Sequence, residues 1–369
     1  MNLLLSSLAR LQAVYGAKDL RRVLLAVEEL VQARATQGIA SRMLLVDVGM
    51  AEHGIAGDAT DPAAIAAQVA AVARALTQAG DRLESVLIVG GPAVIPFDLA
   101  PNPIADDGDA AIPSDTLYSV RQPDALLPDW PVGRLPGAEG RRANADLLVK
   151  LLLQAAILHG RKQQTPFAKT FGYSTAVWRE AAAQVYAELS GAPLLVSPPT
   201  VGASLDVALL DGADAVYCNL HGVRDGPVWY GQADGAQGYL LALRVEDVRR
   251  ARLSGALVLS EACYGALVAE RSEQSSLALA FLDRGAACFV GATAMSYGPA
   301  NTPLSEADLL ALHFWRAARQ GGSTIGQAFL QARTHMLHEM LARQPMLDDD
   351  DRKTALEFVL YGDPTLKLH

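Results

Sequence analysis

Three short apolar runs in the second half of the chain constrain its fold more than any other feature. The runs are residues 213–222 (ADAVYCNLHG), 256–265 (ALVLSEACYG) and 286–293 (AACFVGAT). Each is apolar, contains β-branched residues and reaches a small residue at its end. That pattern is typical of a buried strand in a parallel sheet. The sequence therefore predicts an α/β protein built on a mostly parallel sheet.

Two of these runs finish on a residue that can take part in catalysis. His221 lies at the end of the first run, and Cys263 lies at the end of the second. The carboxyl ends of neighbouring parallel strands line one crevice, where ligands bind in open α/β sheets. If the two strands are adjacent, a thiol and an imidazole project into this crevice together. A nucleophile with a base in reach is the core of a cysteine hydrolase.

Composition limits the classes of function. The chain has 369 residues, of which 51% are hydrophobic and 19% are charged, so it can bury a core of two ordinary domains or of one large α/β unit. The net charge is −9 and basic residues do not cluster, so we expect no nucleic-acid partner. The sequence has no apolar stretch of about 20 residues and no signal-peptide pattern at its start, so we expect no membrane partner.

The three cysteines fall in or at the end of predicted central strands. They are Cys218, Cys263 and Cys288. This placement favours reduced thiols over a disulfide framework and predicts a cytoplasmic protein. A cysteine at a buried strand end is usually a small core residue, and we keep this interpretation for Cys218 and Cys288. The placement of Cys263 together with His221 favours catalysis instead.

The first half of the chain shows β-α-β punctuation, which predicts a right-handed parallel unit. Asp61 is a suitable N-cap for an Ala-rich helix that starts at Pro62. The segment 96–136 is rich in Pro, Asp and Gly, and it predicts a long surface excursion. The predicted elements here are helices at 3–12, 19–34, 62–77 and 141–159, and strands at 43–48 and 85–95.

The acidic residues of the excursion raise the question of a metal. Four acids lie within residues 106–115, but their spacing does not match an EF-hand loop. We therefore predict a solvated loop and no metal site, and leave a structural calcium at 106–115 as an open alternative.

The second half continues the alternation of strands and helices. A polar stretch near residues 160–165 predicts a boundary, which divides the chain into domains 1–163 and 164–369. The predicted elements are strands at 169–174, 194–197 and the three apolar runs, and helices at 177–189, 205–210, 275–284, 305–319 and 323–343.

Several separated motifs resemble, in the same order, those of one enzyme family. They are Pro113-Ser114-Asp115 with Tyr118, Val132-Gly133-Arg134, Leu220-His221-Gly222 with Trp229, Glu261-Ala262-Cys263, Ser296-Tyr297, and Gly362-Asp363-Pro364-Thr365-Leu366. This ordered set resembles the gingipain-type cysteine peptidases of the caspase, legumain and gingipain clan. The resemblance implies a caspase-like α/β/α sandwich with two gingipain-like subdomains, of which residues 1–163 are non-catalytic and residues 164–369 are catalytic.

The resemblance also implies a mechanism. Cys263 is the expected nucleophile and His221 its base, and the N–H groups of Gly222 and Cys263 are expected to hold the oxyanion. The orienting acid is expected to be Glu261 or Glu139. The mechanism needs no cofactor and no metal. A protein or peptide is the expected substrate, and a regulatory protein partner is possible.

Peptidases of this clan choose substrates largely by the residue before the cut, the P1 residue. The expected pocket contains Tyr297, Ser296 and Trp229, and an aromatic wall favours a long cationic side chain. Asp225 is the acid expected to meet that cation, so we favour Arg or Lys at P1. The alternative is Asp at P1, which Arg224 would receive.

The same residues leave one other class of function open and argue against two more. A catalytically silent caspase-like scaffold or sensor module would keep Cys263 and His221 as relics, and this alternative stays open. A different α/β hydrolase is excluded because the chain has no G-x-S-x-G nucleophile elbow. A dinucleotide-binding domain is excluded because residues 89–92 (VGGP) do not fit G-x-G-x-x-G.

Overall fold

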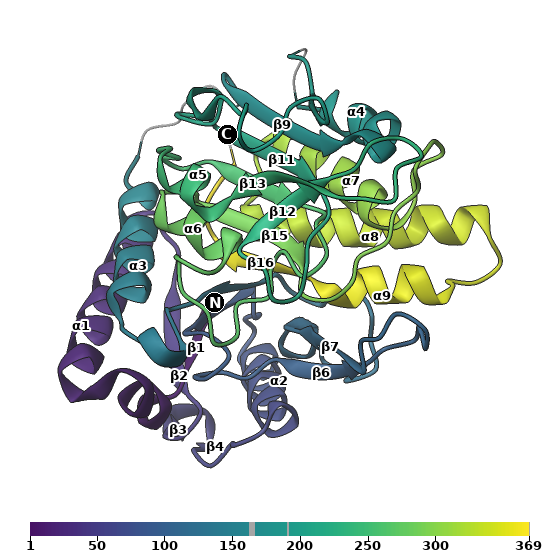
Figure 1. Ribbon diagram of the computed structural model, residues 1–369. Helices are drawn as coiled ribbons and strands as arrows, with labels where there is room; N and C mark the ends of the chain where they lie inside the picture. Colours follow the sequence, from purple (N-terminus) through teal and green to yellow (C-terminus); the bar gives the residue numbers. More distant parts are fainter. Residues whose placement is uncertain (162–166, 190–191, 369) are drawn as a thin grey trace.

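The computed structural model describes residues 1–161, 167–189 and 192–368. Its centre is a twelve-stranded sheet with the order β10-β9-β11-β14-β15-β16-β8-β5-β1-β2-β3-β4 (Figure 1). Most neighbouring strands are parallel, while β16 runs antiparallel to β15. The predicted boundary near residues 160–165 coincides largely with residues 162–166, which lie outside the described residues.

The strands are β1 (Asn2–Ser6), β2 (Ser41–Leu45), β3 (Gly49–Met50), β4 (Ile55–Ala56), β5 (Ser85–Val89), β6 (Asp98–Pro101), β7 (Ala111–Ser114), β8 (Val132–Leu135), β9 (Thr170–Thr175), β10 (Leu195–Ser197), β11 (Ala215–Asn219), β12 (Val228–Gly231), β13 (Leu240–Arg244), β14 (Leu257–Ser260), β15 (Cys288–Ala292) and β16 (Phe358–Gly362). The helices are α1 (Leu8–Thr36), α2 (Pro62–Gln78), α3 (Asp146–His159), α4 (Arg179–Tyr186), α5 (Val245–Arg249), α6 (Leu277–Asp283), α7 (Glu306–Gln320), α8 (Ile325–Arg343) and α9 (Asp349–Glu357).

Helices cover both faces of the sheet. Side chains of β11 alternate between two buried clusters: Val216 and Cys218 join the cluster that contains α3 and α6, and Ala215 and Tyr217 join the cluster that contains α7 and α8. Successive side chains of a strand point to opposite faces, so the two clusters lie on opposite sides of the sheet. Figure 1 shows α1 beside α3, and α7 beside α8. The predicted α/β/α sandwich with a mostly parallel sheet is confirmed.

Most predicted elements are present within a few residues of their expected bounds. The helix from Pro62 is capped by Asp61, whose side chain accepts from the N–H of Ala64 at 2.8 Å. The predicted helix at 205–210 is a single 3-10 turn, Val207–Leu209. The hairpins β6-β7 and β12-β13 were not predicted.

The prediction of a helix at residues 3–12 is wrong for its first half. Residues 2–6 form β1, which pairs in parallel with β2 and β5. Leu3, Leu4 and Leu5 are fully buried, because both faces of a central strand are covered. The helix starts only at Leu8, after the Ser7 side chain accepts from the N–H of Arg10. Periodicity alone cannot separate so short an apolar run from a buried helix.

The prediction of a surface excursion at residues 96–136 is also wrong in part. The segment contains β8, a central strand between β5 and β16. Arg134 of β8 is fully buried, where Nε and Nη2 donate to Asp115 at 2.9 and 2.5 Å. Its Nη1 donates to the carbonyls of Gly90 and Ile95. A charged residue in a four-residue strand hides the apolar pattern that marks a central strand.

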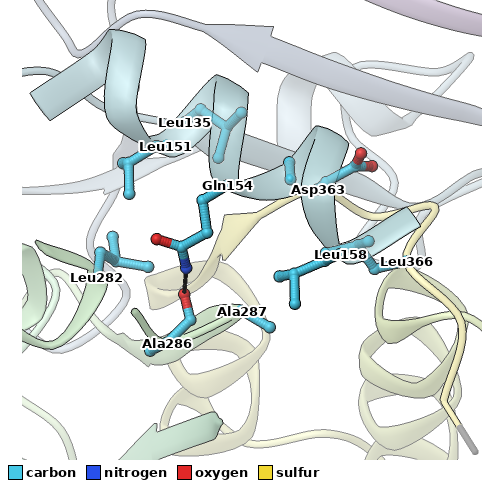
Figure 2. A pocket seen from close by; sticks show the side chains of 10 residues that line it. Leu135, Leu151, Gln154, Leu158, Leu282, Ala286, Ala287, Asp363 and Leu366 are labelled. Carbon is cyan, nitrogen blue, oxygen red and sulfur yellow. Dashed lines mark hydrogen bonds between the residues drawn. The ribbon is translucent and has the colours of Figure 1, made fainter. Parts of the chain in front are cut away.

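The C-terminal motif is held by a second buried ion pair. Asp363 accepts from Arg34 Nη2 at 2.6 Å and contacts His159 Nε2 at 2.9 Å. The N–H and hydroxyl of Thr365 also donate to Asp363. Figure 2 shows a pocket beside this residue, where Gln154 donates to the carbonyl of Ala286 at 2.8 Å. Asp363 therefore fixes the turn after β16 against α1 and α3.

Candidate active site

The strands that carry His221 and Cys263 are neighbours. β11 pairs in parallel with β14, and Cys218 is opposite Ser260. Both strands therefore end at the same edge of the sheet, and the predicted adjacency is confirmed. Gly222 packs directly on Cys263, because a Cβ at position 222 would overlap the Cys263 carbonyl oxygen. Only a glycine allows the histidine loop to approach the cysteine loop this closely.

Cys263 is half-buried, and its thiol lies against the backbone of Ser296. The Sγ atom is 3.4 Å from the Ser296 N–H nitrogen and 3.5 Å from its carbonyl oxygen. Burial raises the pKa of the Cys263 thiol to about 11, although the Ser296 N–H lowers this pKa. The thiol is thus protonated at neutral pH and needs a base before it can attack. Cys218 and Cys288 are fully buried, as predicted for core residues.

His221 is fixed by its backbone and by two aromatic side chains that contact its ring. Its N–H and carbonyl exchange hydrogen bonds with Tyr230 of β12 at 2.9 and 2.8 Å. Its ring centroid lies 4.3 Å from that of Trp178 and 4.6 Å from that of Tyr239. Nε2 lies 2.9 Å from Oε1 of Gln232. Burial lowers the pKa of His221, and the Gln232 contact raises it. The imidazole is therefore neutral at neutral pH, as a base must be.

A buried ion pair lies beside Tyr297, the expected wall of the specificity pocket. The ammonium of Lys353 lies 5.0 Å from the Tyr297 ring centroid and pairs with Asp107. The side chains of Lys353 and Asp107 are fully buried. Burial raises the pKa of Tyr297 to about 12. The Tyr297 ring thus already lies against a cation of the protein itself, which the sequence did not indicate.

Asp109 links three segments around Cys263. Its Oδ2 accepts from the Tyr264 hydroxyl at 3.0 Å and from the Met295 N–H at 2.9 Å. It also pairs with Arg224, whose guanidinium lies 5.1 Å from the Tyr264 ring centroid. Tyr264 follows Cys263 directly and has a φ of 56°, a conformation that bulky residues rarely adopt. Asp109 therefore helps to hold the backbone on both sides of the thiol.

The prediction that the acids of residues 106–115 lie in a solvated loop is wrong for three of them. Asp107, Asp109 and Asp115 are buried, and each pairs with a basic side chain from another segment. Those partners are separated by up to 246 positions along the chain, so no local pattern could have indicated them. Within residues 1–161, 167–189 and 192–368, no group of three or more His, Cys, Asp or Glu side chains is arranged to hold a metal ion.

Glu357 is a further acid near Cys263 that the sequence did not indicate. It is fully buried at the end of α9, and neither carboxylate oxygen has a close hydrogen-bond partner. Burial raises its pKa well above the ordinary value, while Lys353 and the nearby Ser296 hydroxyl lower it. Its charge also influences Cys263, whose pKa it raises. A buried, unpaired carboxyl close to a thiol is characteristic of a functional site.

The two other side chains predicted for the pocket, Trp229 and Asp225, differ in their burial. Trp229 is only 3% exposed, and its ring stacks on Phe281 and lies near Phe289. These contacts are those of a core residue. Asp225 is exposed on the histidine loop, and its charged neighbour is Arg271.

The two candidate orienting acids do not contact the imidazole in the described part of the chain. Glu261 accepts from Asn219 Nδ2 at 3.0 Å, and the same amide donates to Asp308 at 3.3 Å. Burial raises the pKa of Glu261 to about 7. Glu139 accepts from the N–H of Ala93 at 3.0 Å. Sequence reasoning missed Gln232 at the imidazole, although it follows His221 by only 11 residues.

Among the described helices, none is both long and apolar enough to cross a membrane. A model of peptidase family C25 matches residues 15–151 and 173–369. A search of curated proteins found no match.

Solved structures with the same fold include peptidases. One, described as "Structure of Protease", has a TM-score of 0.72 and 12% identity over 100% of this chain and 78% of its own. The Arg-specific cysteine proteinase gingipain R (RgpB) has a TM-score of 0.68 and 13% identity, with 100% and 78% covered. The complex of Porphyromonas gingivalis RgpB pro- and mature domains gives a TM-score of 0.65 at 13% identity, with 100% and 79% covered.

Proposed function

The chain belongs to peptidase family C25 and is a cysteine endopeptidase, and on this premise we propose that Cys263 and His221 form its catalytic dyad. The observation that carries the proposal is their placement after adjacent parallel strands, with Gly222 packed on the Cys263 backbone. The expectation that these two residues act together came from the sequence, and the geometry supports it.

The proposed reaction is amide hydrolysis in two steps. The neutral imidazole of His221 takes the thiol proton of Cys263, and the thiolate attacks the scissile carbonyl carbon. The new C–S bond forms as the carbonyl π electrons move to oxygen, and the oxyanion then expels the amine, which takes the proton from His221. Water, activated by the same imidazole, attacks the thioester and releases the acid and free Cys263.

The oxyanion is assigned to the backbone N–H groups of Gly222 and Cys263. Among the described contacts, the Gly222 N–H donates to no acceptor, so it is available to a substrate oxygen. The two peptide segments are in contact at this point, because a Cβ at position 222 would lie 3.1 Å from the Cys263 nitrogen, and this closeness supports the assignment of both donors to one oxyanion. In comparable hydrolases, one oxyanion donor lowers the activation barrier by about 3–4 kcal/mol.

We propose Arg or Lys at P1. Three acids, Asp107, Asp109 and Glu357, gather beside Cys263 with two bases, Lys353 and Arg224. Each base is paired with one aspartate, which leaves Glu357 as the acid without an ion-pair partner among the described residues. A P1 cation would supply that partner. Arg224 is engaged with Asp109, which weakens the alternative of Asp at P1.

The dyad is tested by substitution of the nucleophile. Cys263→Ala is expected to abolish cleavage of a denatured protein substrate and to keep the melting temperature nearly unchanged, because the lost sulfur is small and lies at a strand end. His221→Ala is expected to lower kcat by orders of magnitude with a smaller change in KM.

Matched controls come from the other cysteines. Cys218→Ala and Cys288→Ala are expected to retain turnover per folded molecule, since both thiols lie in the core. Turnover by the Cys263→Ala protein would disprove the dyad. A wild-type protein without turnover, in which an active-site thiol probe labels no cysteine selectively, would favour the scaffold or sensor alternative.

The P1 preference is tested with a fluorogenic peptide library that varies only this residue. Turnover concentrated on Arg and Lys is the expected result, and turnover confined to Asp would overturn it. Tyr297→Ala is expected to weaken binding of the preferred substrate. The reason is that the Tyr297 ring lies beside Lys353, in the group of charged residues proposed to receive the P1 side chain.

Location and partners also remain proposals. All three cysteines are unpaired, which agrees with the reducing conditions of the cytoplasm. Protein or peptide substrates follow from the family, and we also propose a regulatory protein partner.

A further inference from the structure

Gln232 occupies the position next to His221 where a thiol–imidazole site needs an orienting group. It follows β12 directly, and the backbone of β12 is bonded to His221 through Tyr230. Its Oε1 lies 2.9 Å from Nε2 of the imidazole. The two acids that the sequence suggested for this role, Glu261 and Glu139, are engaged elsewhere.

The Gln232 side chain is fixed in one orientation. Its Nε2 donates to the carbonyl of Ala236 at 2.7 Å, so its Oε1 is the atom that faces the imidazole. The backbone is fixed as well, because the Gln232 N–H donates to Oγ1 of Thr175 at 2.6 Å and this hydroxyl donates back to the Gln232 carbonyl at 3.0 Å. An amide oxygen only accepts hydrogen bonds. Nε2 of His221 must therefore carry the hydrogen.

The orientation of Gln232 decides which imidazole nitrogen is the base. In a neutral imidazole one nitrogen is a donor and the other an acceptor. With the hydrogen on Nε2, the lone pair is on Nδ1. Trp178 and Tyr239 pack against the ring from close range, which restricts its rotation.

We propose that Gln232 is the positioning residue of the catalytic histidine and that Nδ1 is the atom that carries the proton between Cys263 and the leaving amine. The proposal rests on the dyad proposed above. Gln232 holds His221 in the tautomer protonated on Nε2 and leaves the ring uncharged until it receives the thiol proton at Nδ1. No bond to Gln232 forms or breaks during the reaction.

A neutral amide suits this site better than a carboxylate. A carboxylate at the same distance would favour the imidazolium and raise the pKa of His221. The imidazole would then be protonated over more of the working pH range, so a smaller fraction of the enzyme would have the neutral imidazole that takes the thiol proton. Gln232 selects the tautomer without that cost.

The experiment uses the full chain in two backgrounds. In Cys263→Ala protein, the ¹⁵N shifts of His221 report its tautomer and pKa. In active protein, kcat, KM and the pH–rate profile report catalysis. The variants are Gln232→Ala and Gln232→Glu, and the control is Gln237→Ala, an exposed glutamine of the same loop.

Gln232→Ala is expected to mix the two neutral tautomers of His221 and to lower kcat by about 10- to 100-fold, part of the roughly 10²- to 10⁴-fold that positioned proton transfer contributes. KM should change little. Gln232→Glu keeps an acceptor at Nε2, so it should keep the tautomer, recover part of kcat, raise the pKa of His221 by about one unit or more, and move the acidic limb of the pH–rate profile to higher pH. Gln237→Ala should match the wild type.

An unchanged tautomer and kcat in Gln232→Ala would overturn the role of Gln232 and leave the dyad intact. A Gln232→Glu variant with an unmoved His221 pKa would overturn it as well. Failure of the dyad itself has a different signature, which is full activity in Cys263→Ala. If Gln232→Ala does not fold, the tautomer and pH profile of Gln232→Glu decide the question.

Discussion

Buried charges are treated differently in two regions of this molecule. Around β8 and the turn after β16, the buried acids Asp115 and Asp363 are each bonded to an arginine at two atoms. Arg34 and His159 hold the pKa of Asp363 far below its usual range against the opposing effect of burial. At the ends of β14 and α9, burial instead raises the pKa of Glu261 and Glu357.

The difference separates residues that hold the fold from residues that are available for chemistry. A buried carboxylate with a guanidinium partner is satisfied and has nothing to offer a substrate. A buried carboxyl without a cation keeps its proton until a ligand or a change in pH removes it. The first region contains the motif residues Asp115, Arg134 and Asp363, whereas the second surrounds Cys263.

The largest expected effect comes from breaking a satisfied pair. Arg134→Met leaves Asp115 buried without its guanidinium, so the free energy of unfolding should fall by about 3–5 kcal/mol. Lys150→Met is the matched control, because it breaks the partly exposed pair with Asp283 and should cost under about 1 kcal/mol. Urea denaturation measures both.

The same pair allows a stricter test. The double variant Arg134→Met, Asp115→Leu removes both charges and should regain much of the lost stability, because no unpaired charge stays buried. Equal destabilisation by Arg134→Met and Lys150→Met would show that the buried pair is no different from a surface pair, and the comparison above would fail.

A smaller, pH-dependent effect is expected at Glu261. Its folded pKa is about 7, and the value in an unfolded chain is about 4.3. Because the folded pKa is the higher one, the contribution of this group to stability is fully present below about pH 4.3 and is lost as the pH rises through 7. Asp308 shares this site, and Tyr217 and Asn219 face it.

Glu261→Gln should remove that loss. The variant should match the wild type at pH 5 and exceed it at pH 8 by on the order of 1–3 kcal/mol in the free energy of unfolding. Denaturation curves at several pH values measure this difference, with the exposed Glu246→Gln as control. An identical pH dependence of wild type and Glu261→Gln would refute the assignment of Glu261 as an unpaired buried acid.

Much of the fold was predictable from sequence, because its central strands are apolar runs with clear ends. The adjacency of the strands before His221 and Cys263 followed from their length, pattern and order. β1 and β8 were missed, since one is a run of three leucines that periodicity cannot classify and the other carries the charged Arg134.

Candidate site residues could be named from the sequence only where a residue type itself implies chemistry. Cys263 and His221 could be named, because thiols and imidazoles at strand ends are informative. Asp109 and Lys353 could not be named, because each gains its role from a partner more than 100 positions away. Gln232 was missed because a glutamine carries no catalytic signal until its orientation is known.

The smallest expected effect on stability is at Glu357, where the consequence for substrate binding is the more informative. At pH 6 Glu357→Gln should change the free energy of unfolding by under about 1 kcal/mol, since an amide resembles the protonated acid that burial favours.

A P1 cation should displace the Glu357 proton, although Lys353, Asp107 and Asp109 also face this group. Binding of a basic P1 residue should therefore release a proton, and KM for Arg substrates should fall as the pH rises. In Glu357→Gln that pH dependence should disappear together with much of the preference for Arg over an uncharged P1 residue of similar length. Steady-state kinetics from pH 6 to 8 on a matched pair of fluorogenic peptides measures both. If the variant keeps the wild-type preference, the cation is received by another acid and Glu357 belongs with the residues that hold the fold.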